Sequence, residues 1–220
     1  MDGALRHERL DETALERDGR FWEIYAQAFA ASEKEPREVI LESVRRKTGM
    51  VFRTLLDGRT VALATTHALR KIPALFLVYL AVDPELRSRG AGGSLLEHLH
   101  QASGQLVPGS LGMVWETERA EDAGPGPARA LRERRLEFFR RHGASVVSGS
   151  YRQPALDGVA PVPMNLLFRP AEPGQDIGPV FARALARSIY EEKYQALNGV
   201  SWAHLEDLLA GKATPRPPWP

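Results

Sequence analysis

The sequence predicts an α/β fold with a mixed sheet, and three observations carry that prediction. Nine consecutive apolar residues at 74–82, ALFLVYLAV, suit a central strand that is buried on both faces. Segments rich in β-branched residues flank Asp57-Gly58, a pair that favours a hairpin turn. Apolar residues at helical spacing alternate with further strand-like segments, as in proteins that combine a sheet with covering helices.

The N-terminal part supplies two helices and the first strands. Phe21, Ile24 and Tyr25 recur at helical spacing, and Pro36 suits the first turn of a second helix. The expected order is a short strand at 4–10, helices at 19–31 and 36–48, hairpin strands at 50–56 and 59–67, and the central strand at 74–82.

The remainder alternates helices and strands before a helical C-terminal segment. The expected elements are a helix at 90–101, a strand at 111–115, a loop at 120–127, a helix at 128–143, strands at 144–151 and 162–168 around a polar turn at Asp157-Gly158, and helices at 177–196 and 202–210. The expected domains are 1–170 and a C-terminal extension with its tail, 171–220. The extension is predicted to pack on the domain, to cover a ligand site on it or to form a homodimer contact.

Composition excludes several classes of function. The 220 residues include no cysteine, which removes disulfides, thiolate metal sites and a cysteine nucleophile. His98 and His100 lie two apart on a helix and make a poor metal pair, so no metal site is expected. The net charge of +1 and the polar N-terminal sequence predict a cytoplasmic protein without nucleic-acid or membrane partners. The Arg-, Ala- and Gly-rich composition indicates a bacterial source.

The segment VDPELRSRGAGGSLLEHL at 82–99 predicts an anion site. The central strand leads into a glycine-rich turn and then a helix, whose first N–H groups have no intrahelical partner. Glycines let the backbone approach a phosphate, and Arg87 and Arg89 can add charged contacts, although Arg89 is more simply explained as solvated charge. Neither the Walker pattern nor G-x-G-x-x-G is present; the motif is R-x-x-G-x-G, and we expect it to bind a pyrophosphate.

This motif in its context resembles the GNAT superfamily of acyl-CoA-dependent N-acyltransferases. LAVDPELRSRGAGGSLLEHL matches the family signature [Q/R]-x-x-G-x-[G/A] at a strand–helix junction, and RRLEFFRRHGASVV is similar to a later helix–strand motif. The resemblance spans roughly residues 52–168. It implies a GNAT-like mixed, mostly antiparallel sheet flanked by helices, here with an appended C-terminal helical segment.

The resemblance also implies roles for residues. Acetyl-CoA would be the co-substrate, and an amine of a small molecule or peptide would attack its thioester directly. Backbone groups of Leu80, Ala81 and Val82, beside a strand bulge, would bind the pantetheine arm. Backbone amides would hold the pyrophosphate, and they are those of Arg87, Ser88, Arg89, Gly90, Ala91, Gly92, Gly93 and Ser94. Phe138, Phe139 and Arg141 would lie near the thiol end of CoA or near its nucleotide.

The acid and base do not follow from the resemblance. Many family members carry Tyr where this chain has Phe139, and Glu where it has Val78. The candidates are therefore Glu116, Glu118 and Tyr151, with a water chain as an alternative. Tyr79 and His67 are further candidates, but a core position and a structural position explain them more simply. Glu116 and Glu118 alternate on one strand and share a face, but an ion pair with the nearby arginine-rich helix explains them equally well. The acidic residues that could attract a cationic amine are Glu33, Glu35, Glu116, Glu118, Glu121 and Asp122.

Two other functions compete with an N-acetyltransferase. The absence of the expected Tyr and Glu favours a non-catalytic acyl-CoA-binding or regulatory module. A structural α/β protein without a ligand is the third possibility, and it predicts no CoA binding at all.

Overall fold

One sheet forms the centre of the fold in the computed structural model, which describes residues 4–29, 33–155, 160–175 and 177–211. Its strands are β1 (Arg6–Leu10), β2 (Gly49–Leu56), β3 (Arg59–Leu69), β4 (Ala74–Val82), β5 (Gly112–Glu118), β6 (Ser145–Ser148), β7 (Arg152–Gln153) and β8 (Val162–Pro170). The spatial order is β1-β2-β3-β4-β5-β8-β6, with β7 paired to β8. Only β4 and β5 pair in parallel among the described strands, which confirms the mixed, mostly antiparallel sheet.

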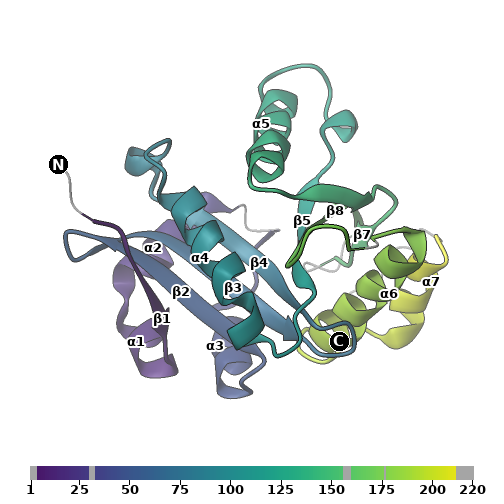
Figure 1. Ribbon diagram of the computed structural model, residues 1–220, viewed down its shortest axis with the longest axis horizontal. Coiled ribbons are helices and arrows are strands. Elements are labelled where there is room, and N and C mark those ends of the chain that lie inside the picture. The colour runs from purple at the N-terminus through teal and green to yellow at the C-terminus, as the bar shows by residue number, and fades with distance from the viewer. Residues whose placement is uncertain (1–3, 30–32, 156–159, 176, 212–220) are drawn as a thin grey trace.

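Helices cover both faces of this sheet. They are α1 (Glu12–Arg17), α2 (Gly19–Ala28), α3 (Arg37–Arg45), α4 (Ala91–Leu106), α5 (Pro127–Arg141), α6 (Pro179–Ile189) and α7 (Trp202–Leu209), with short turns η2 (Pro84–Leu86), η3 (Ala120–Asp122) and the π-helical η4 (Tyr190–Gln195). Figure 1 shows α4 across the near face, α1 to α3 behind the sheet, and α6 and α7 together at one end. None of the helices within the described ranges combines the length and apolar character needed to cross a membrane.

Three apolar clusters hold these layers together. Leu95 and Leu99 of α4 pack with Trp115 of β5 on the near face. The N-terminal helices bury residues such as Phe21 against the opposite face of β2 to β4. The C-terminal helices bury a third cluster, which includes Leu185, against β4, β5 and β8. The segment after residue 170 therefore packs on the same sheet, and the expected domain boundary there stays a prediction.

The structure changes several predicted boundaries. The helix expected at 19–31 ends at Ala28, α4 continues to Leu106, and β5 continues past 115 to Glu118. The strand expected at 144–151 is shorter, and the helix expected at 177–196 changes from α-helical to π-helical at Tyr190. The sequence prediction missed α1, which begins where the Asp11 side chain accepts a hydrogen bond from the Ala14 N–H. The Asp157-Gly158 turn and the PRPPWP tail lie outside the described residues.

Candidate active site

The turn between β4 and α4 has the backbone of an anion site. Ser88 and Gly90 both have positive φ, at 64° and 84°, and Gly90 is the N-cap of α4. No side chain caps this helix, so the N–H groups of its first turn remain available to a ligand. The 16-residue length of α4 adds the full positive potential of a helix N-terminus.

Asp83 fixes the start of this turn. Its carboxylate is fully buried, accepts from the Glu85 N–H at 3.1 Å, and pairs with Arg20 of α2. Arg59 of β3 lies 3.3 Å from the same carboxylate. The turn is therefore tied to two other elements before any ligand binds.

Removing this carboxylate should destabilise the protein. We expect Asp83→Ala to lower the free energy of unfolding by about 3 kcal/mol, because Arg20 loses its buried partner. Urea unfolding measures the effect, and Glu85→Ala is the matched control, since Glu85 is an exposed residue of the same turn. Equal stabilities of the two variants would contradict this role of Asp83.

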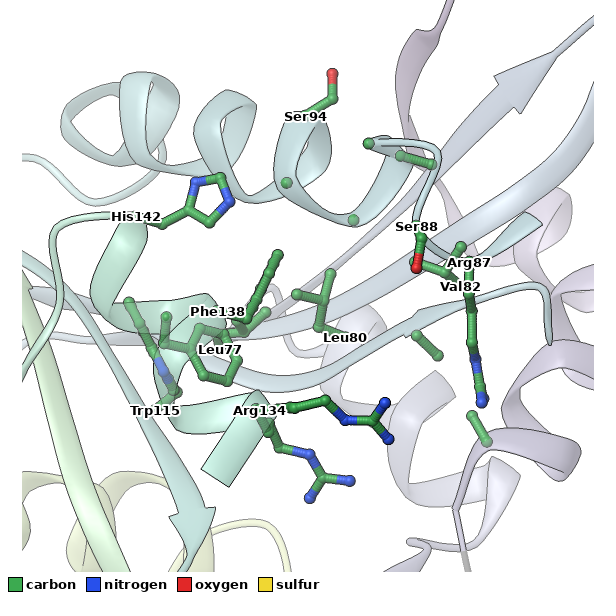
Figure 2. Close-up of a pocket in the computed structure, with 18 of the residues that line it drawn as sticks. Leu77, Leu80, Val82, Arg87, Ser88, Ser94, Trp115, Arg134, Phe138 and His142 are labelled. Atoms are coloured by element: carbon green, nitrogen blue, oxygen red, sulfur yellow. The ribbon is translucent and has the colours of Figure 1, made fainter. Parts of the chain in front are cut away.

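A cavity of about 1210 Å³ opens beside the turn (Figure 2). Its walls come from the end of α2, from β4 and the turn, from α4, from β5 and from α5. The lining residues are Gln27, Ala28, Phe29, Leu77, Val78, Leu80, Ala81, Val82, Leu86, Arg87, Ser88, Gly90, Ala91, Gly92, Gly93, Ser94, Glu97, Trp115, Glu116, Leu131, Arg134, Arg135, Phe138, Phe139, Arg141 and His142. The residues assigned to acetyl-CoA from the sequence all lie on this surface except Arg89.

Glycine at position 92 keeps one wall of this cavity open. A Cβ there would lie 3.0 Å from Cγ2 of Val82, so the first turn of α4 approaches β4 too closely for a larger residue. A Cβ at Gly93 would lie 2.9 Å from the ring of His142. The side chain of Ser94 points away from the cavity and accepts or donates a hydrogen bond with His7 of β1, so only the backbone of Ser94 can serve a ligand (Figure 2).

The cavity has a cationic wall that the sequence analysis found only in part. Arg87 and Arg141 were expected there, whereas Arg134 and Arg135 of α5 were not. These α5 residues share a helix face with Phe138 through three- and four-residue spacing. That spacing is the signal that would have identified them, because Phe138 had already been placed near the ligand.

The cavity reaches the place where β4 and β5 separate. Their parallel pairing ends at Leu77 opposite Trp115, and the register of β4 with β3 skips Val78, which forms a bulge. From there to Val82, β4 pairs with β3 on one edge only. The free edge can bind the amide groups of an extended ligand in the manner of an added strand.

Glu116 lies at this point of separation. The half-buried carboxylate lines the cavity and accepts hydrogen bonds from Tyr151, from Tyr194 and from Gln153, whose Nε2 lies 2.8 Å from Oε2. Burial raises the pKa of Glu116 to about 7, although these three hydrogen bonds and the Lys193 charge favour the ionised form. A carboxylate with this pKa can accept a proton near neutral pH.

The other predicted catalytic residues lie away from the cavity surface. Glu118 pairs with Arg132 and Arg135 of α5, as the ion-pair interpretation expected, and it does not line the cavity. Tyr151 is buried behind Glu116 and bonds its carboxylate. Of the six acidic residues expected to attract an amine, only Glu116 is part of the lining: Glu35 pairs with Lys193, and Glu121 and Asp122 pair with Arg119.

Phe139 occupies a packing position. Its ring is buried and lies 4.9 Å from the indole of Trp115. It also packs edge-on against Phe138, at 5.1 Å between ring centroids. The position therefore forms an apolar wall of the cavity and has no proton to transfer.

Glu97 joins three elements at the cavity's edge. Its carboxylate accepts from both terminal nitrogens of Arg169, at 2.8 and 2.9 Å, and bonds Nδ1 of His142 at 2.8 Å. The Arg169 hydrogen bonds hold the pKa of Glu97 down, to about 2, against the opposing effect of burial, and His142 adds to the lowering. This cluster links α4 to β8 and α5.

The lowered pKa of Glu97 predicts a specific acid sensitivity. The ionised Glu97 stabilises the folded state fully above its ordinary pKa of 4.5. This stabilisation is lost as the pH falls towards about 2, because Glu97 takes up its proton at a higher pH in the unfolded chain than in the folded one. The difference in unfolding free energy between the wild type and Glu97→Gln should therefore shrink between pH 6 and pH 3. Urea titrations at several pH values measure it, and a difference independent of pH would contradict the role given to the Arg169 pair.

No group of three or more His, Cys, Asp or Glu side chains in the described ranges is arranged to hold a metal ion.

Comparison with known proteins agrees with this geometry. The model of the acetyltransferase (GNAT) family matches residues 18–123, which run from α2 through the turn to the segment after β5. No curated protein matches the sequence.

Solved structures share the fold at low identity. A GNAT-family protein from Bacteroides thetaiotaomicron, assigned as an acetyltransferase, is 21% identical with a TM-score of 0.67, covering 89% of this chain and 99% of its own. The yncA protein of Salmonella typhimurium, solved with acetyl-CoA, is 14% identical with a TM-score of 0.55, covering 79% and 97%. The GNAT-like decarboxylase GphF, solved with isobutyryl-CoA, is 20% identical with a TM-score of 0.57, covering 76% and 100%.

At these identities the solved structures establish the fold and leave the reaction open, as a decarboxylase among them makes plain. The family match covers the turn that carries the R-x-x-G-x-G motif. The fold shared with the solved structures covers most of the chain. Residues 18–123 of the chain therefore match the GNAT acetyltransferase family, and the chain has a GNAT-like fold.

Proposed function

We propose that this protein is an acetyl-CoA-dependent N-acetyltransferase that acts on a primary amine of a small molecule or peptide by direct attack. The observation that carries the proposal is the position of Glu116. It is a carboxylate at the separation of β4 and β5, in the same cavity as the glycine-rich turn. A cationic wall suited to phosphates and a base suited to an amine thus meet in one cavity.

The residues present fit acetyl-CoA in three respects. The N–H groups at the start of α4 and Arg87 suit the pyrophosphate. The free edge of β4 from Val78 to Val82 suits the amides of the pantetheine arm. Arg134, Arg135 and Arg141 supply further positive charge for the nucleotide's phosphates.

Glu116 is the proposed general base. A primary amine must lose a proton to form the amide. A carboxylate can accept this proton at neutral pH when its pKa is about 7, because that pKa lies close to the pH of the reaction. In the balanced reaction, the nitrogen–carbon bond forms, the carbon–sulfur bond breaks, and one proton passes from nitrogen to sulfur. Phe139 cannot deliver that proton, so it reaches sulfur from cavity water or from protonated Glu116.

A non-catalytic acyl-CoA-binding module is the second candidate. Phe139 and Val78 favour it, because these positions carry no group that could act as acid or base. The two candidates differ in turnover and agree in ligand binding. The acceptor class, a homodimer and the cytoplasmic location stay predictions from the sequence.

An amine panel separates the two candidates. Purified protein with acetyl-CoA and one amine at a time should release free thiol, and the acetylated amine should appear by mass spectrometry in equal amount. Release without an acetylated product would be thioester hydrolysis and would argue against transfer. Binding of acetyl-CoA without turnover by any amine would favour the regulatory module.

A further inference from the structure

The π-helical turn η4 is fixed to four separate parts of the molecule. The hydroxyl of Tyr190 donates to the carbonyl of Arg152. The carboxylate of Glu192 accepts from the backbone N–H groups of Arg70 and Lys71 at the β3–β4 turn. A π-helical turn is rare and occurs often at functional sites, so its presence here calls for a reason.

Lys193 ties the same turn to the N-terminal half. Its side chain is fully buried and its Nζ donates to Glu35, in the segment between α2 and α3. Asn198 donates to the same Glu35 oxygen at 2.6 Å. Because removal of either charge would leave the other buried without a counter-charge, this pair fixes η4 to the segment between α2 and α3.

Tyr194 places the end of the turn on Glu116. Its hydroxyl lies 2.8 Å from Oε2 and 3.0 Å from Oε1 of Glu116, and it accepts a hydrogen bond from Gln153 at 3.1 Å. The hydroxyl of Tyr151 donates to Oε1 as well. The direct partners of the carboxylate are therefore neutral donors, and Tyr194 is the one that the C-terminal segment supplies.

The charged groups near Glu116 come from several elements, and Arg134 and Arg135 of α5 line the same cavity. Glu35 and Lys193 neutralise each other, and an ionised Glu116 remains as one negative charge that faces the cavity. The titratable groups around it are Tyr151, Tyr190, Tyr194 and Lys193, with Glu35 beyond. Burial raises the pKa of each of these tyrosines, so all three keep their protons and act as donors near neutral pH.

We propose that Tyr194, held in place by η4 and its Lys193–Glu35 pair, is a positioning residue that orients Glu116 and favours its ionised form. The inference rests on the proposed function for its catalytic meaning. Through Tyr194, the C-terminal helical segment would take part in the region where the amine acceptor reacts. Tyr194 reaches the reacting amine only through Glu116.

Tyr194→Phe tests this role, with Tyr190→Phe as the matched control. Both variants remove one buried hydroxyl from η4, but the hydroxyl of Tyr190 bonds a backbone carbonyl instead of Glu116. The readout is the titration of the Glu116 side-chain carboxyl by ¹³C NMR, with the resonance identified by its loss in Glu116→Gln. The midpoint should rise by about one pH unit in Tyr194→Phe, since one donor to the charged form is lost, and stay unchanged in Tyr190→Phe.

The pH dependence of kcat/KM gives a second readout, which would not change if Tyr194 served only in packing. The rise of kcat/KM with pH should shift upward by the same amount in Tyr194→Phe, while the KM for acetyl-CoA stays within about twofold. An unchanged Glu116 midpoint, or an equal shift in Tyr190→Phe, would overturn the inference. A wild-type protein that transfers no acetyl group would remove the proposed function, and the NMR result would still decide the link between Tyr194 and Glu116.

A reverse experiment covers failure of Tyr194→Phe to fold. In Glu116→Gln the ¹³Cζ resonance of Tyr194 should move, because its acceptor changes from a carboxylate to an amide, and that of Tyr190 should move much less. Equal movement of both resonances would contradict a specific Tyr194–Glu116 link.

Discussion

Replacement of Glu116 by glutamine should lower kcat/KM for the amine by about 10²- to 10⁴-fold, the usual contribution of a general base. The variant removes the proton acceptor and keeps the shape of the side chain. Acetyl-CoA should still bind with a Kd within about twofold of the wild type, because Glu116 lies where β4 and β5 separate and is not part of the glycine-rich turn. Initial rates of thiol release and calorimetric titration measure the two quantities.

The matched control is Glu118→Gln. This residue lies two positions along the same strand, but its carboxylate pairs with Arg132 and Arg135 and does not line the cavity. Its kcat/KM should stay near that of the wild type. Equal losses in the two variants, or full activity of Glu116→Gln, would contradict the assignment of the base.

The pH dependence of kcat/KM gives a further test of Glu116 as the base. Glu116 must be ionised to act, so wild-type kcat/KM should rise with pH through its pKa of about 7. Glu116→Gln has no such group and should lose that rise.

Replacement of Gly92 by valine should weaken acetyl-CoA binding by about 10²-fold or more. The new side chain would point at Val82, 3.0 Å from its Cγ2 at the Cβ alone, and would displace the first turn of α4 from β4. Each charged hydrogen bond lost from the phosphates is worth about 1.5–3 kcal/mol, so loss of two accounts for the effect. Overpacking of this contact should also cost about 1–3 kcal/mol of stability.

Gly104→Val separates binding from general disturbance of the helix. Gly104 is exposed on the same helix, and a Cβ there meets no atom within 4 Å. Its acetyl-CoA affinity should match that of the wild type, and its thermal unfolding should shift little. Calorimetry and thermal unfolding of both variants check this, and normal acetyl-CoA binding by folded Gly92→Val would show that the pyrophosphate lies elsewhere.

The sequence was sufficient where a local pattern decides the structure. The limits of β4 follow from an unbroken apolar run that only a strand buried on both faces explains. The glycine-rich turn followed because the R-x-x-G-x-G motif stands directly between that strand and the apolar repeat of α4. The arginines of α5 were within reach of the same reasoning, since their spacing matches that of Phe138.

The catalytic arrangement depends on contacts that local patterns do not encode. Glu116 was a candidate together with Glu118, and nothing in their alternation separates them. They differ because Tyr151, Gln153 and Tyr194 reach Glu116 from 35, 37 and 78 residues along the chain, whereas Glu118 meets α5. The π-helical form of η4 has no clear sequence signal either, because Tyr190 and Tyr194 also fit an ordinary helical stripe.

The most direct test of the account is calorimetric titration of the purified protein with acetyl-CoA, with CoA and ATP as comparisons. We expect saturable binding of acetyl-CoA and CoA and none of ATP, because the cavity offers the free edge of β4 to a pantetheine arm as well as charge to phosphates. Absence of binding by both acetyl-CoA and CoA would contradict the placement of the pyrophosphate at the glycine-rich turn, and with it the proposed reaction.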